Sequence, residues 1–235
     1  MGRSGLHQWL TKPCSAIALF GLLSSDARPQ QPANDWLIVP NVRVGPITAS
    51  STERSLREAF GDKSVEKSPP FGAEGPIQAG ALIYPKDLSR VISVTWRGKG
   101  ERELPDTIAF CFGFHTSRWH TPSGIGCDTT VRELESLNRG PFTLSGYGRD
   151  NSGTVMSWQS GALERELAPK GALEIAVSPG QRDWMTNLTP EERRTVFGDN
   201  EIRSGDPVIQ RLNPVVYKII FKFPEGTGVP ALKLR

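Results

Sequence analysis

The clearest alternation of hydrophobic and polar residues lies in the segment VVYKIIFKF, residues 215–223. A repeat of two residues is typical of a β-strand with one buried face. Lys218 and Lys222 share a face with Val216, so we expect that face to be partly solvated. The opposite face is predicted to point into the core, and it consists of Tyr217, Ile219, Phe221 and Phe223.

Shorter apolar runs predict further strands. Residues 91–96 alternate and end at Trp96, and residues 107–114 place a row of apolar side chains opposite Cys111. Both runs have the period of two that a half-buried strand requires. The remaining predicted strands cover residues 36–39, 142–144, 154–158 and 173–177.

Three segments predict helices that begin with a capping box, in which two side chains three residues apart satisfy backbone N–H groups of the first turn. The boxes are formed by Ser50 and Glu53, by Thr130 and Glu133, and by Thr189 and Glu192. A further helical turn is predicted between Ser204 and Pro214. Residues 62–80 are rich in Pro, Gly and charge, which predicts a long loop.

One order of elements occurs twice. Residues 124–158 contain a capped helix, a glycine that ends it and a hairpin that ends at Trp158. A similar order begins at Gly45 and ends at Trp96. A tandem duplication would explain both copies. Independent origin explains them as well, because short capped helices are common.

Composition favours many turns and short elements, since 24 glycines and 19 prolines among 235 residues exceed the usual share of about 12%. Together with the mixed helix and strand patterns, this predicts an α+β fold. We expect two helix-plus-antiparallel-sheet units with a C-terminal strand region. The first unit is assigned to residues 36–120, and the second, with the C-terminal strand extension, to residues 121–235.

The N-terminal residues have the pattern of an export signal. Positive charge at Arg3 and Lys12 precedes the short apolar run of residues 16–23, and small residues follow at positions 25 and 27. This predicts a signal peptide over residues 1–27 and a polar linker over residues 28–35. The run is shorter than the roughly 20 residues that span a bilayer, so no membrane span is expected after cleavage. An apolar arm or an uncleaved anchor is the alternative.

Export determines how the cysteines are interpreted. Cleavage removes Cys14 and leaves Cys111 and Cys127. An even pair in an oxidising compartment favours a disulfide. Two buried free thiols are the alternative, because both cysteines have apolar neighbours.

Charge and motifs argue against several functional classes. The net charge of +3 is spread along the chain without a basic stripe, so nucleic acid is not an expected partner. His115 and His120 lie in the loop between the two cysteines, with a spacing that matches no helical metal site. There is no G-x-S-x-G motif. We therefore expect no metal, no cofactor and no catalytic residues.

The hairpin of residues 142–158 carries the candidate binding residues. Tyr147, Arg149 and Asp150 lie at its glycine-rich turn, and Trp158 ends its second strand. Aromatic residues and arginine dominate binding hot spots. The alternative is that Arg149 and Asp150 are turn residues and Trp158 belongs to the core.

The segment Gly45–Thr48, followed by a helix that ends at Phe60 and Gly61, resembles the helix-loop-sheet unit of the SmpA/OmlA outer-membrane assembly lipoproteins. It is similar also to the β-lactamase-inhibitor proteins, which carry that unit twice, and to exported bacterial proteins with RVGPIT-like starts. The resemblance covers residues 45–160 and implies a two-unit α+β fold. The lipobox cysteine of the first family is missing, and the resemblance transfers no activity.

These features predict an exported protein, periplasmic or secreted, that binds a partner without catalysis, the partner being a cell-envelope protein. The alternative is a hydrolase-type enzyme with a site near the loop between Cys111 and Cys127. An enzyme would place His115 or His120 within hydrogen-bond reach of a serine or carboxylate in a pocket. A binding protein would expose an apolar surface instead.

Overall fold

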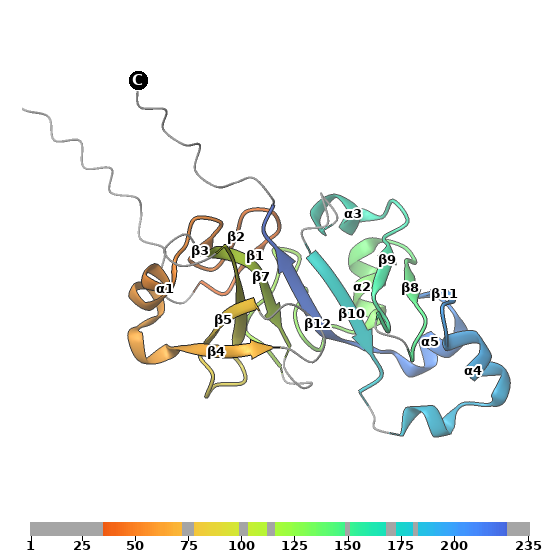
Figure 1. The fold of residues 1–235 in the computed structure, drawn as a ribbon. Coiled ribbons are helices and arrows are strands. Elements are labelled where there is room, and N and C mark those ends of the chain that lie inside the picture. The colour runs from red at the N-terminus through yellow and green to blue at the C-terminus, as the bar shows by residue number, and fades with distance from the viewer. Residues whose placement is uncertain are drawn as a thin grey trace, which may run out of the picture. The chain divides into compact units, whose positions relative to one another are not determined.

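The computed structural model describes residues 35–71, 78–98, 103–111, 116–148, 151–167, 173–180 and 183–224 (Figure 1). The predicted signal peptide, residues 1–27, and the predicted linker up to residue 34 lie outside the described residues. Residues 31–235 belong to one structural unit.

Helices and strands alternate irregularly along the described chain. The strands are β1 (Ile38–Val39), β2 (Arg43–Val44), β3 (Ile47–Thr48), β4 (Val65–Phe71), β5 (Gln78–Ile83), β6 (Ile92–Arg97), β7 (Leu104–Phe110), β8 (Thr143–Ser145), β9 (Val155–Ser157), β10 (Leu173–Ser178), β11 (Glu201–Arg203) and β12 (Val215–Lys222). The α-helices are α1 (Glu53–Phe60), α2 (Val131–Asn138), α3 (Ala162–Leu167), α4 (Pro190–Val196) and α5 (Pro207–Leu212), and the 3₁₀ helices are η1 (Asp62–Ser64) and η4 (Trp184–Asn187).

The prediction of an α+β fold is confirmed. The strands form three antiparallel sheets, with the orders β1-β2-β3, β10-β12-β7-β6-β5-β4 and β11-β8-β9. The six-stranded sheet takes β4 to β7 from the predicted first unit and β10 and β12 from the second (Figure 1). A tandem repeat is compatible with this arrangement but is not needed to explain it.

Strand β12 lies between β7 and β10, so a segment from the end of the chain joins two segments that are far apart in sequence (Figure 1). Phe221 pairs with Ile108 on one side and with Leu173 on the other. Phe221 is fully buried. This strand therefore completes both the hydrogen-bond ladder and the core.

The predicted faces of β12 are correct only in its second half. Ile219, Phe221 and Phe223 are buried as expected, but Val216 is buried as well and Tyr217 is half-buried. The pairing with β10 shifts register in the middle of the strand, which leaves Tyr217 as an extra residue. A bulge of this kind reverses the faces on one side of it, which a strict period of two cannot predict.

The prediction of a long loop over residues 62–80 is wrong. Strand β4 occupies residues 65–71 and pairs with β5, which begins at Gln78. Strand β4 lies at the edge of the sheet. Edge strands tolerate proline and charged residues, because one row of their backbone groups has no ladder partner.

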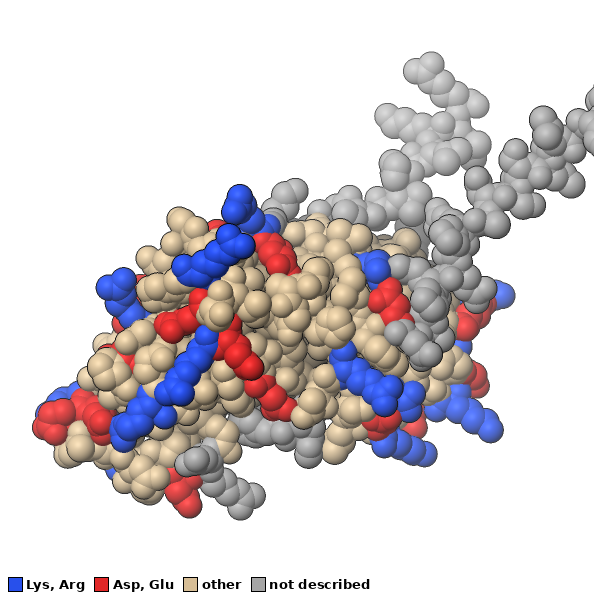
Figure 2. All heavy atoms as spheres, turned by 180° about the vertical axis from the view of Figure 1, so that it is seen from behind, with Lys and Arg blue, Asp and Glu red and all other residues tan. Residues whose placement is uncertain are grey.

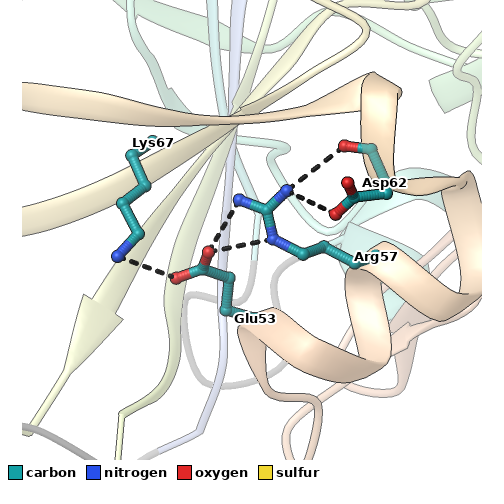
Figure 3. Close-up of polar contacts among 4 residues, drawn as sticks. All are labelled: Glu53, Arg57, Asp62 and Lys67. Carbon is teal, nitrogen blue, oxygen red and sulfur yellow. Dashed lines mark hydrogen bonds and ion pairs between the residues drawn. The ribbon is translucent and has the colours of Figure 1, made fainter.

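The capping boxes at Thr130 and Thr189 are confirmed. The first box is wrong, because the N-cap of α1 is Thr52, and its partner is Ser55. Glu53 instead binds Arg57, with Lys67 close by (Figure 3). The predicted turn before Pro214 is present as α5, capped by Asp206.

Cys111 and Cys127 form the predicted disulfide, with Cα atoms 5.5 Å apart. It connects the end of β7 to the segment that precedes α2. Trp119, between them in sequence, is fully buried. Its indole Nε1 donates to the Arg90 carbonyl at 2.9 Å, and its ring contacts Trp36 at a centroid distance of 5.0 Å. The loop between the two cysteines is therefore anchored by the core as well as by the disulfide.

Replacing both Cys111 and Cys127 by Ser should lower the free energy of unfolding by about 3 kcal/mol, because the bridge closes a loop between residues 16 positions apart. Urea denaturation of the two proteins would measure the difference. A loss below about 1 kcal/mol would show that Trp119 and its neighbours already restrict the loop, and would contradict this expectation.

Candidate functional site

The hairpin formed by β8 and β9 is present as the sequence predicts, and the described residues that flank its turn contact other parts of the chain. Ser145 N donates to the Thr154 carbonyl, and Gly153 N donates to the Ser145 carbonyl. The hairpin is also linked to the six-stranded sheet, because Thr154 pairs with Ala176 and Val177 N donates to the Gly153 carbonyl. A Cβ at Gly153 would lie 2.0 Å from the Val177 carbonyl oxygen, so this contact requires glycine.

Tyr147 lies in the core and not on the surface, with 3% of its area exposed. Its ring packs against Trp184 at 5.0 Å, and Trp184 stacks on Phe197 at 5.4 Å. Its backbone N–H donates to the Val196 carbonyl, and its carbonyl accepts from Gly198 N. Tyr147 therefore attaches the hairpin to the end of α4.

The phenol group of Tyr147 has no hydrogen-bond partner among the residues that the structure describes. Burial raises the pKa of this phenol far above its ordinary value of 10. The group is accordingly neutral at any physiological pH and is unsuited to proton transfer.

Trp158 is also a core residue, with 5% of its area exposed. Its ring lies 5.0 Å from that of Phe142, and its carbonyl accepts a hydrogen bond from Asn138 Nδ2. Arg149 and Asp150 lie outside the described residues. Tyr147 and Trp158 are thus both buried, Tyr147 against Trp184 and Trp158 against Phe142, and the binding site expected at this hairpin stays a prediction.

A groove of about 570 Å³ lies beside the hairpin. Its described lining consists of Ser145, Gly146, Gly148, Asn151, Met156, Gly198 and Asp199. Met156 is 60% exposed, the largest exposure among the large hydrophobic residues that the structure describes. A Cβ at Gly146 would lie 2.4 Å from the Gly198 carbonyl oxygen, so the two walls meet backbone to backbone. The lining of this groove combines peptide groups with the hydroxyl of Ser145, the amide of Asn151, the carboxylate of Asp199 and the apolar side chain of Met156.

A second hollow, of about 430 Å³, lies beside the disulfide and includes Cys127, Asp128 and Glu133. Its two carboxylates have structural partners. Asp128 accepts from the Thr116 hydroxyl, and Glu133 accepts from Thr130 N. That backbone hydrogen bond lowers the pKa of Glu133, so its carboxylate is ionised and engaged in capping α2.

The histidine arrangement that an enzyme would need is not seen in the described residues. His120 is exposed, and its Nδ1 lies 3.0 Å from the carbonyl of the adjacent Thr121. No described serine or carboxylate lies within hydrogen-bond reach of the ring. His115 lies outside the described residues. Among the residues that the structure covers, no group of three or more His, Cys, Asp or Glu could hold a metal ion.

No protein-family model, curated protein or solved structure matches this chain. The resemblances proposed for residues 45–160 therefore rest on the sequence motif alone. Within the described ranges, no helix is long and apolar enough to cross a membrane.

The sequence pattern did not single out Met156 and Leu88, two of the exposed large hydrophobic residues of the described chain. Met156 is the central residue of a three-residue strand whose neighbours are half-buried. Leu88 is 52% exposed in a loop that carries no recognised motif. Alternation around Met156 was the one available signal, since the side chains of a strand point to opposite faces in turn.

The Tyr147→Phe variant should be as stable as the wild type or slightly more stable, because it removes a buried hydroxyl group without a described partner and retains the ring packing. Thermal or urea denaturation would measure the change. A loss of about 1 kcal/mol or more would contradict the expectation and would place a bound water on the phenol.

The capping carboxylate of Glu133 should make stability depend on pH. A lowered pKa means that Glu133 stabilises the folded state above its ordinary pKa of 4.5, and that this stabilisation is lost as the pH falls below it. The Glu133→Gln variant should therefore be less stable than the wild type at neutral pH, and the difference should shrink in acid. Urea midpoints at neutral and acidic pH would test this, and a constant difference would contradict it.

Proposed function

We propose that this is an exported protein, periplasmic or secreted, that binds a cell-envelope protein and catalyses no reaction. The leader pattern of residues 1–27 and the disulfide between Cys111 and Cys127 support export, because disulfides persist in oxidising compartments. The hydrolase alternative draws less support, since the described histidine, His120, has only a backbone carbonyl as a partner.

The observation that carries this proposal is the exposed Met156 beside the hairpin groove. Methionine is adaptable and recurs at binding surfaces. The hairpin that presents it is held rigidly by the packing of Tyr147 and Trp158, so little conformational entropy is lost on binding. The groove volume of about 570 Å³ falls in the range of ligand sites.

A partner that binds in the groove should bind more weakly when Met156 is replaced by Glu. Purified protein would be immobilised and used to capture partners from envelope extract, with identification by mass spectrometry. We expect binding of the captured protein to weaken about tenfold or more, because a charge would replace an apolar contact.

Met185→Glu provides the matched control. Met185 is 45% exposed and does not line the groove, so the same charge change should leave capture intact. Equal capture by the wild type and by Met156→Glu would contradict the proposed surface.

Export is tested separately by N-terminal sequencing of the protein from fractionated cells. We expect an N-terminus near Arg28 in the exported fraction. Full-length protein that retains Met1 in the cytosol would contradict it.

A further inference from the structure

The loop Tyr84–Val91, which joins β5 to β6 and which we call the Leu88 loop, is fixed at its base. Tyr84 N donates to the Ser64 carbonyl at 2.8 Å, and the Tyr84 carbonyl accepts from Asp87 N at 3.0 Å. Tyr84 has φ of 54°. A bulky residue rarely adopts this left-handed conformation, and it persists only where neighbouring contacts enforce it.

Side chains fix the rest of the loop. Asp87 accepts from Arg90 Nε at 2.6 Å and from the Ser89 hydroxyl at 2.7 Å. The guanidinium of Arg90 lies 4.3 Å from the centre of the Tyr84 ring, and the Arg90 carbonyl accepts from the buried Trp119. Tyr84 in turn packs against Phe60 at a centroid distance of 5.7 Å. The loop is thus attached to the core through aromatic rings.

The segment that lies opposite the Leu88 loop is η1, and an ion-pair network fixes it. Helix η1 begins at Asp62 and also contains Lys63 and Ser64, and Asp62 binds the guanidinium of Arg57 at 2.9 Å (Figure 3). Arg57 also binds Glu53 at 2.8 Å, with Lys67 of β4 on the other side of that carboxylate (Figure 3). Helix α1, η1 and β4 are therefore linked by charge as well as by the chain.

Between the two walls lies a hollow of about 630 Å³, lined among others by Lys63, Tyr84, Pro85, Lys86 and Leu88. Leu88 is 52% exposed although the residues around it are immobilised. An apolar side chain held out by a rigid loop loses little entropy on binding, which suits it as an anchor for a partner.

Charge indicates the kind of partner. Lys63 and Lys86 form no ion pair with any described residue. The local carboxylates are engaged, since Asp87 binds Arg90 and Asp62 binds Arg57. On the face shown in Figure 2, lysine and arginine side chains are interspersed with aspartate and glutamate. Two lysines without an ion-pair partner among the described residues line the same hollow as an exposed leucine, which favours a ligand that combines carboxylates with an apolar side chain.

We propose that the Leu88 loop and η1 form a second binding surface, which takes an acidic segment of a partner protein. An apolar side chain of that segment packs on Leu88 and Pro85, and its carboxylates face Lys63 and Lys86. This goes beyond the proposed function, because none of these residues lines the hairpin groove. An acidic peptide fits better than a polyanion such as nucleic acid, because a peptide can place an apolar side chain on the exposed leucine.

A display library of random peptides, selected on the purified protein, provides the probe. We expect selected peptides to combine Asp or Glu with Leu or Phe, and their binding to weaken as salt is added. By fluorescence anisotropy, affinity should fall about tenfold or more in Leu88→Ser and in Lys86→Glu. Val42→Ser is the matched control, since Val42 is 58% exposed and lies outside the hollow, and it should bind as the wild type does.

Reversing the charges of both the peptide and the protein distinguishes a loss of recognition from a loss of folded structure. A peptide in which the acidic residues are replaced by Lys should bind Lys86→Glu better than it binds the wild type. The proposal is overturned if no peptide is selected, or if selected peptides bind Leu88→Ser and Lys86→Glu as well as the wild type. Loss of peptide binding in Met156→Glu alone would assign the peptides to the hairpin groove. Selective binding of duplex DNA or heparin would show that the ligand is a polyanion and not a peptide. Either result overturns this inference, and neither decides whether the hairpin groove binds a partner of its own.

Discussion

The insertion of β12 between β7 and β10 is the interaction on which the rest of the structure depends. Without it, the sheet of β4 to β7 would end at β7, and β10 would have no ladder partner among the described strands. The strand also contributes Ile219 and Phe221, both fully buried, to the core. The strand thereby joins residues that are far apart in sequence.

The surfaces considered for binding follow from that sheet. The hairpin of β8 and β9 is attached to β10 by the pairing of Thr154 with Ala176, and the Leu88 loop connects β5 to β6 within the sheet. In both places aromatic residues lie underneath and a single aliphatic side chain, Met156 or Leu88, is exposed. Both proposed binding surfaces therefore share a rigid base and one exposed apolar side chain. The carboxylates of the described hollow beside Cys127 have structural partners instead.

Local signals in the sequence predicted local structure well. The capping box at Thr130 and the strand around Phe221 depend on a few neighbouring residues, and both are present. The predictions were wrong where contacts between distant parts of the chain determine the local structure. The face of Val216 depends on a bulge against β10, and the edge strand β4 exists because β5 pairs with it. Tyr147 resembles an exposed hot-spot residue in sequence, and only its packing on Trp184 shows that it is interior.

Native-state hydrogen exchange of the Phe221→Ala variant tests the central role of β12 most directly. Removing this buried ring should cost about 3–5 kcal/mol. If β12 unites the sheet, the slowest amides of β6, β7 and β10 should all exchange faster, by roughly two to four orders of magnitude, and by a common factor. Faster exchange confined to β10 and β12, with β6 and β7 as protected as in the wild type, would contradict the account and would indicate two units that unfold separately.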